Sequence, residues 1–451
     1  MTTRVLVPSG VLGLGFDRKA LADGVALKPD IIAIDGGSTD SGPFYLGTGT
    51  SKYSRAACKS EGKQLMQARE QANVPLVITS CGTCGTDSMV DWMLEITREL
   101  AAELSQKLTV ATLYSELSTE FVEGQYRQGK LSSLAPEVAL DAEAINSIDH
   151  IVALAGAEQI NSALATGADI VLAGRATDTA GISAVPLSRG EHAGAAWHGA
   201  KIAECGALCS TNPTSGVIAL DVDNDGFTVW PLAENAVCTP HSVSAHMLYE
   251  NADPFTLYEP GGALQVKKSV YESIDHKRVR VTGSQWVGSD VYTVKLEGAR
   301  AVGYQSTLLA ILRDAHYVAN AKDWVVRLQG FLAAEVASRM GLANDEYDIE
   351  FRLIGIDATL GELEKHQSAP TEVGVLVLVS ANSEALADDL ARLINPFLLH
   401  YPLSDNEELP TFAFPYSPAQ TNRGAIYEFC LNHVLTLADP MDAFRLQVHQ
   451  L

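Results

Sequence analysis

Long hydrophobic runs are absent from this sequence. Although 47% of its 451 residues are hydrophobic, no apolar stretch reaches the ~18 to 20 residues that a membrane-spanning helix needs. Pro8, Gly10 and Gly13 interrupt the N-terminal apolar stretch and Asp17 follows it, which does not suit a signal helix. We therefore expect no membrane partner.

Basic residues are scarce as well. The chain has 32 Lys and Arg against 55 Asp and Glu, which gives a formal net charge of −23 at pH 7. A field of this sign repels phosphate backbones and anionic membranes. The composition therefore argues against nucleic-acid partners, while a local basic pocket for a small anion remains compatible with it.

Two further patterns are missing. The seven cysteines are odd in number and scattered, which argues against a disulfide framework and predicts a reducing, cytoplasmic location. Gly10, Gly13 and Gly15 do not fall at the G-x-G-x-x-G spacing of a dinucleotide fingerprint. We therefore expect no nicotinamide cofactor.

Apolar runs typical of strands alternate with helical segments up to about residue 213. The predicted strands cover residues 4–12, 30–34, 75–79, 108–113, 149–154 and 169–173. This alternation predicts an α/β fold with a Rossmann-like parallel sheet and helices on both faces. Right-handed crossovers would bring the turns after these strands to one edge of the sheet.

The pattern changes after residue 213. Asn224, Asp225 and Gly226 lie between two apolar runs and predict a hairpin. We predict a first domain at 1–213, a β-rich segment with a long helix at 214–344 packed on it, and a small α+β domain at 345–451.

A glycine-rich turn follows the predicted strand 75–79 and precedes a predicted helix at about 89–104. The N–H groups of such a turn, together with the positive end of the helix, can bind an anion. We expect this turn to bind substrate and stabilise negative charge through Ser80, Gly82, Thr83, Gly85 and Thr86.

Cys81 and Cys84 lie within the same turn at C-x-x-C spacing, and no second such pair exists to complete a zinc site. A thiol at a helix N-terminus can act as a base or a nucleophile. The stretch is similar to one half of a cysteine-based racemase, in which Cys205 or Cys209 would be the second thiol. The alternative is that small residues pack a tight turn.

Asp35 and Asp40 follow the predicted strand 30–34 and bracket Gly36, Gly37 and Ser38. Two carboxylates with hydroxyls suit a divalent metal ion, or a carboxylate base beside backbone donors. We expect Gly36, Gly37 and Ser38 to bind substrate. A solvated turn is the alternative interpretation.

Charged residues follow two further predicted strands. Glu116 could be a general acid or base, or could cap a helix. We expect Arg175 and Asp178 to bind substrate, with Arg175 holding a carboxylate by two hydrogen bonds; the alternative is a structural pair of Arg175 and Asp178. His241 and His246 are five residues apart, which does not match the spacing of a helical metal pair.

Five stretches resemble the acyclic terpene utilisation (AtuA) family over most of the chain: IIAIDGGSTDSGPFYLG, GADIVLAGRATDTAG, KIAECGALCS, VKLEGARAVGY and FCLNHVLTLADPMDAFR. The resemblance implies a Rossmann-like α/β domain with a small α+β C-terminal domain. It also implies a role in degrading branched acids and their CoA esters, as a lyase or hydratase.

The main functional hypothesis is a lyase, hydratase or isomerase that acts by proton transfer on a small carboxylic acid or its CoA ester. Asp35, Asp40 or Glu116 would move the proton. One alternative is a cofactor-independent isomerase or racemase that uses Cys81 or Cys84, and another is a non-catalytic module that binds a small anion. The cofactor is left open, with a divalent metal ion as one option, and we expect a homo-oligomer.

Overall fold

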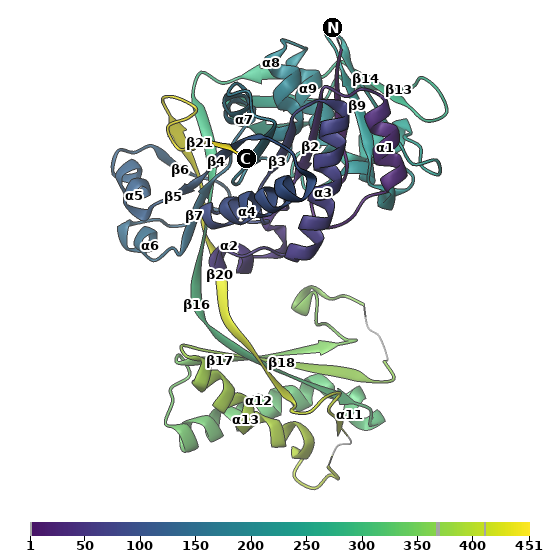
Figure 1. Cartoon of the computed structure of the whole chain (residues 1–451). Coiled ribbons are helices and arrows are strands. Elements are labelled where there is room, and N and C mark those ends of the chain that lie inside the picture. Colours follow the sequence, from purple (N-terminus) through teal and green to yellow (C-terminus); the bar gives the residue numbers. More distant parts are fainter. Residues whose placement is uncertain (1, 367–369, 410–411) are drawn as a thin grey trace. The chain divides into compact units, whose positions relative to one another are not determined.

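The contacts within the computed structural model divide the chain into two compact units. The structure describes residues 2–366, 370–409 and 412–451. Unit 1 comprises Met1–Arg300 and Phe429–Leu451, and unit 2 comprises Ala301–Glu428 (Figure 1). These units differ from the predicted domains, because the segment that follows residue 213 stays with the first 213 residues as far as residue 300.

A 10-stranded sheet forms the centre of unit 1. Its strands, in spatial order, are β13 (Val270–Ser273), β14 (Val279–Thr282), β10 (Gly226–Pro231), β9 (Ile218–Val222), β1 (Thr3–Val7), β2 (Ile31–Asp35), β3 (Leu76–Thr79), β8 (Ile170–Ala173), β4 (Thr109–Tyr114) and β21 (Arg445–Gln450). The five strands from β1 to β4 in this order are parallel, and the flanking strands are antiparallel. The predicted α/β class is confirmed.

The order of the parallel strands is not that of the dinucleotide-binding fold. That fold has the order 3-2-1-4-5-6, whereas the parallel strands here run β1, β2, β3, β8, β4 across the sheet. A Rossmann-like topology is therefore not confirmed.

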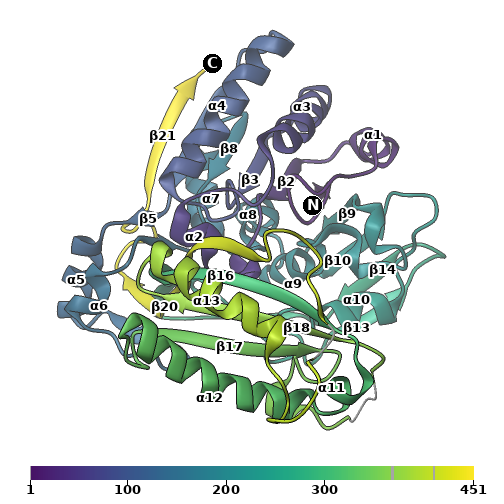
Figure 2. The same ribbon diagram turned by 90° about the horizontal axis from the view of Figure 1, so that it is seen from below.

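Helices cover both faces of this sheet. On one face lie α1 (Arg18–Ala26), α3 (Arg55–Ala72) and α4 (Asp87–Leu104), and Figure 2 shows α3 and α4 side by side. On the other lie α7 (Ala157–Leu164), α8 (Ala180–Ser188) and α9 (Ala193–Ala203). Alternation along β1 explains this, because Leu6 packs with the first group while Val5 and Val7 pack with the second.

Two predictions about strands had different outcomes. The hairpin at Asn224–Gly226 is confirmed, since β9 and β10 pair antiparallel on either side of it. They extend the parallel sheet at its β1 edge instead of packing beside it. The predicted strand 149–154 exists as β7 (His150–Ala153), but it pairs with β5 (Glu116–Leu117) and β16 (Tyr292–Leu312) and not with the parallel strands.

Smaller elements complete unit 1. They are α2 (Phe44–Thr48), α5 (Thr119–Arg127), α6 (Ala142–Asn146), α10 (Pro240–His246), β6 (Leu131–Ser133), and a three-stranded sheet of β11 (Thr256–Glu259), β12 (Gly262–Gln265) and β15 (Gln285–Gly288).

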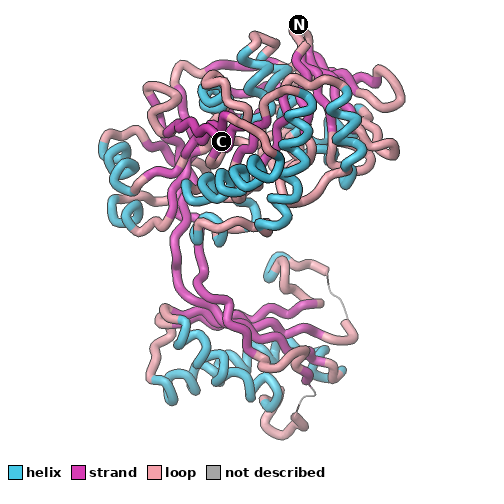
Figure 3. Tube along the Cα trace, viewed as in Figure 1, coloured by secondary structure: helices cyan, strands magenta, loops and turns pink. Residues whose placement is uncertain are grey.

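Unit 2 has a sheet with helices packed on it. In it β17 (Tyr347–Ile354) pairs antiparallel with β18 (Val373–Ala381), and α12 (Ala321–Met340) and α13 (Glu384–His400) pack against them (Figure 3). Its remaining elements are α11 (Ala315–Ala319) and β19 (Phe412–Ala413), while β16 and β20 (Gln420–Leu437) begin or end in it. Among the helices of the described residues, none has both the length and the apolar character that crossing a bilayer requires.

Candidate functional site

A cavity of about 500 Å³ lies in unit 1 at the carboxyl ends of the parallel strands. Its wall includes Ser9 after β1, Gly37 after β2, Thr83 after β3 and Asp178 after β8. Open α/β sheets bind ligands at this edge, because the loops that follow parallel strands converge there. The turns after β1, β2, β3 and β8 therefore lie at one edge of the sheet, as the sequence predicted for them.

Asp35 is the last residue of β2 and lines this cavity. Its Oδ1 accepts a hydrogen bond from the backbone N–H of Gly37 (2.6 Å), and its Oδ2 accepts from the hydroxyls of Thr79 (3.1 Å) and Ser80 (3.3 Å). Burial, followed by the nearby charge of Asp178, raises the pKa of Asp35 to about 7, against the opposing effect of Arg175. Near neutral pH both forms of this carboxyl group are populated.

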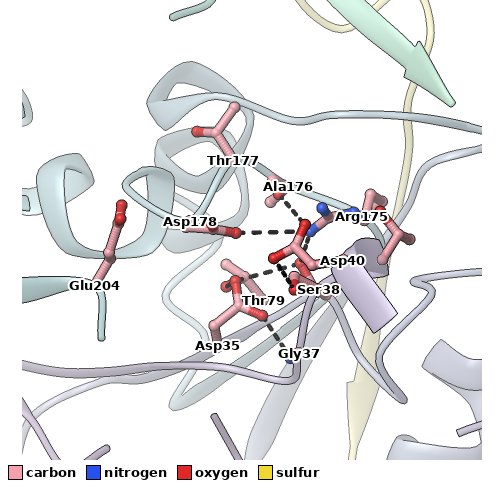
Figure 4. A network of polar contacts seen from close by, with 12 residues as sticks. Asp35, Gly37, Ser38, Asp40, Thr79, Arg175, Ala176, Thr177, Asp178 and Glu204 are labelled. Atoms are coloured by element: carbon pink, nitrogen blue, oxygen red, sulfur yellow. Dashed lines mark hydrogen bonds and ion pairs between the residues drawn. The ribbon is translucent and has the colours of Figure 1, made fainter. Parts of the chain in front are cut away.

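Arg175 lies behind the cavity and binds protein groups. Its Nε donates to Glu297 Oε2 (3.2 Å), its Nη1 donates to Ser80 Oγ (3.0 Å), and Nη1 lies 3.7 Å from Asp178 Oδ1. Figure 4 shows the contact to Asp178 together with the bonds of Asp35 to Gly37 and Thr79. With only 6% of its side chain exposed, Arg175 positions Ser80 and Asp178 and does not extend into the cavity as a substrate clamp would.

The N–H groups of the Ser80–Thr86 turn are mostly bonded within the protein. Ser80 and Cys81 donate to the carbonyls of Gly174 (2.9 Å) and Ala173 (3.0 Å). Thr83 and Gly85 donate to carbonyls within the turn itself. Bonded in this way, these donors are not available to an anion, so the expected anion-binding role is not supported.

Glycines in and beside this turn permit close backbone contacts. A Cβ on Gly85, which has φ +65°, would lie 2.1 Å from the backbone nitrogen of Arg175. A Cβ on Gly36 would lie 2.5 Å from the carbonyl oxygen of Ser80. Gly82, with φ +61°, packs against Met89 in the same manner. These predicted substrate-binding residues therefore shape the wall, whereas Thr83 lines the cavity itself.

Cys81 and Cys84 are completely buried, each with 0% exposure. Burial raises the pKa of both thiols, which disfavours the thiolate. The cysteine that lines the cavity is Cys205, while Cys209 is buried beside Cys238. The geometry agrees with the packing interpretation of the C-x-x-C motif.

Glu116 has a capping role. Its Oε2 accepts from the backbone N–H of Asp87 (2.8 Å) at the start of α4, and its Oε1 lies 2.6 Å from His150 Nδ1. It is not among the residues that line the cavity of Asp35. Asp35, Cys81, Glu116 and Arg175 therefore do not meet in one crevice, although Asp35 and Arg175 both bind Ser80.

Asp40 and Ser38 do line the cavity, and the Ser38 hydroxyl donates to Asp40 Oδ2 (2.6 Å). Within the described residues, the group of three side chains suited to a metal ion consists of Glu204, Cys205 and His246. Asp35 and Asp40 do not belong to it, and metal binding by this pair of carboxylates stays a prediction.

Several cavity residues were not singled out in the sequence. Lys52 is the only lysine or arginine among the described residues that line the cavity. Glu204, Tyr249 and Glu250 also line its wall. Glu204 is buried and bonded to Lys201 Nζ at 2.5 Å. The sequence did contain a signal for Glu204. Lys201 and Glu204 are charged residues three positions apart at the end of α9, whose other residues are mostly small or apolar.

A protein-family model of the acyclic terpene utilisation family protein AtuA matches residues 49–409. The chain belongs to this family. Membership in the AtuA family implies a role in acyclic terpene utilisation. The match begins after Asp35 and Asp40, so these two cavity residues of this AtuA family member lie outside it. No curated protein and no solved structure matches the chain.

Proposed function

We propose that this AtuA family member is a lyase, hydratase or isomerase that transfers a proton on a small carboxylic acid or its CoA ester, with Asp35 as the proton-transferring group. The observation that carries the proposal is the position of Asp35 in the cavity, where burial and Asp178 raise its pKa to about 7. A general base or acid works best when its pKa lies near the working pH.

The bonds to Asp35 suit this role. Gly37, Thr79 and Ser80 hold its two oxygens in a fixed direction. Arg175 in turn holds Ser80, so the base is oriented by a second group that does not face the substrate.

The rest of the cavity suits a small branched substrate. Its apolar residues include Val11, Leu14, Leu208 and Pro213, and about 500 Å³ accommodates a small acid or the acyl end of a thioester. Lys52 supplies a positive charge on the wall for a carboxylate or carbonyl oxygen, a role that the sequence suggested for Arg175.

A deuterium-exchange experiment with a panel of substrates tests the proposal. Branched-chain acids and their CoA esters are incubated with the protein in D₂O, and deuterium at carbon is measured by mass spectrometry. We expect exchange with the wild type and a loss of at least about 100-fold in Asp35→Asn. Asp225→Asn, in the exposed β9–β10 turn, is the control and should exchange normally.

The alternatives give different results. A binding module would raise its melting temperature with one of these compounds and exchange no deuterium. A cysteine-based isomerase would lose exchange in Cys81→Ala or Cys84→Ala and retain it in Asp35→Asn. Either result would overturn the role of Asp35.

A further inference from the structure

Three metal-binding side chains from two separate segments meet beside the cavity. Glu204 and Cys205 directly follow α9, and His246 is the last residue of α10. One ligand atom from each lies within 4.8 Å of the other two. Ligand atoms that share one tetrahedral zinc ion lie about 3.3 to 3.8 Å apart, since zinc-to-ligand bonds are about 2.0 to 2.3 Å long, so a small rotation of the side chains would let one ion contact all three.

His246 provides independent evidence for a missing partner. Only 5% of the residue is exposed, and its Nε2 atom is buried without a hydrogen-bond partner among the described residues. Tyr249 stacks on the ring, with centroids 5.4 Å apart. A buried ring nitrogen without a partner costs free energy, and a bound cation would satisfy it.

The turn that carries Cys205 is held in one conformation. Gly206 has φ +58°, and a Cβ there would lie 2.4 Å from the Gly216 carbonyl oxygen. A Cβ on Gly10 would lie 2.9 Å from the Cα of Cys205. These close backbone approaches restrict movement of the turn, which keeps Cys205 directly beside Glu204.

The charges around the cluster also favour a cation. Asp35, Asp40, Asp178, Glu204 and Glu250 line the cavity, with Lys52 as the basic residue of the described wall. Lys201 binds Glu204 Oε1 and offsets one carboxylate. An ion at the cluster would use the second oxygen of that carboxylate, and a divalent ion would offset the remaining excess of negative charge.

We propose that Glu204, Cys205 and His246 bind a divalent transition-metal ion of the zinc class. A sulfur, an imidazole nitrogen and a carboxylate oxygen form a mixed donor set that suits Zn²⁺ better than Mg²⁺ or Ca²⁺, which prefer oxygen ligands alone. Glu204 and Cys205 line the cavity, so a fourth position on the ion would face it. The proposal does not depend on the reaction of Asp35, because metal binding is measured directly.

Cobalt and zinc titrations of the full-length protein test the site. After chelator treatment and dialysis, we expect one equivalent of Zn²⁺ to bind by calorimetry. Co²⁺ should give a sulfur-to-cobalt charge-transfer band in the near ultraviolet. Cys205→Ser should abolish that band, and His246→Gln should weaken Zn²⁺ binding by at least about tenfold.

Matched controls come from the same chain. His241→Gln changes an exposed histidine of the same helix α10, and Cys58→Ser changes a buried cysteine of α3. Both should bind like the wild type. Circular dichroism melting confirms that each variant is folded, and Cys205→Ser decides the question if His246→Gln does not fold. Folded wild type that binds neither ion, or a cobalt band that survives Cys205→Ser, would overturn the proposal.

Discussion

Ser80 connects Asp35 to Arg175: its hydroxyl lies 3.3 Å from Asp35 Oδ2 and accepts a hydrogen bond of 3.0 Å from Arg175 Nη1. The carboxyl group in the cavity is thus linked to a buried ion-pair network that itself has little access to solvent. Both the protonation of Asp35 and the stability of unit 1 should reflect this link.

The Asp35 carboxyl should make stability depend on pH. Its pKa rises from about 3.9 in the unfolded chain to about 7 in the fold, so the folded state binds more protons between these values. Stability should therefore fall as pH rises from about 4 to 7, by at most roughly 1.4 kcal/mol per pH unit. Thermal melting of Asp35→Asn across this range should show a flatter profile, while Asp225→Asn should follow the wild type.

Removal of Arg175 should strongly destabilise the protein. Arg175→Ala leaves the buried Glu297 with Lys295 as its remaining ion-pair partner, and losing one member of a buried pair costs about 3–5 kcal/mol. The double variant with Glu297→Gln should lose less than the sum of the two single losses, as measured by urea unfolding. Arg127→Ala, whose side chain is 72% exposed, should cost less than about 1 kcal/mol. Additive losses would contradict the coupling.

Gly85→Ala should disrupt the turn between β3 and α4. Gly85 has φ +65°, and a Cβ there would lie 2.1 Å from the backbone nitrogen of Arg175. We therefore expect a loss of more than about 3 kcal/mol in the free energy of unfolding, or failure to fold. Gly124→Ala is the matched control, because Gly124 lies within α5 with nothing within 4 Å of its Cβ position. That variant should be stabilised by roughly 0.5–1 kcal/mol.

Thiol alkylation should follow burial and not the motif. Burial raises the pKa of Cys81, Cys84 and Cys205 alike, but Cys81 and Cys84 have 0% exposure whereas Cys205 is partly exposed on the cavity wall. Peptide mapping after brief treatment with iodoacetamide should therefore find the two partly exposed cysteines, Cys205 and Cys430, modified before Cys81 and Cys84. Rapid labelling of Cys81 or Cys84 in the folded protein would contradict this prediction and support the cysteine-based mechanism.

The contact between His150 and Glu116 should stabilise the fold at low and neutral pH. The bond to Glu116 raises the pKa of His150, so its contribution is complete below the unfolded value of about 6.5 and is lost as pH rises through the higher folded value. Melting temperatures of His150→Gln should lack this decline as pH rises above about 6.5. His241→Gln, exposed on α10, should behave as the wild type.

Local sequence patterns predicted the parallel strands and Asp35, because strand alternation and a polar turn are encoded within a few residues. They could not place β7, since its partner β16 lies about 140 residues later in the chain. They also could not reveal that the N–H groups of the Ser80 turn bind Gly174 and Ala173. That pairing depends on which strand lies beside β3.

The metal cluster illustrates the same limit. Cys205 and His246 were visible in the sequence, but nothing local indicated that two segments about 40 residues apart would meet. Burial of Glu204 and Lys201 was equally hidden, because charged residues at a helix end are usually solvated.

The pairing of β21 with β4 also bears on how the protein is made. Leu451 and Leu108 exchange both backbone hydrogen bonds, at 2.8 and 3.0 Å, and β21 is translated only after the whole of unit 2. Until β21 emerges from the ribosome, this edge of β4 has no strand to pair with. Such an edge is a site at which strands of neighbouring polypeptides can add, so slow translation or loss of β21 would expose the protein to aggregation.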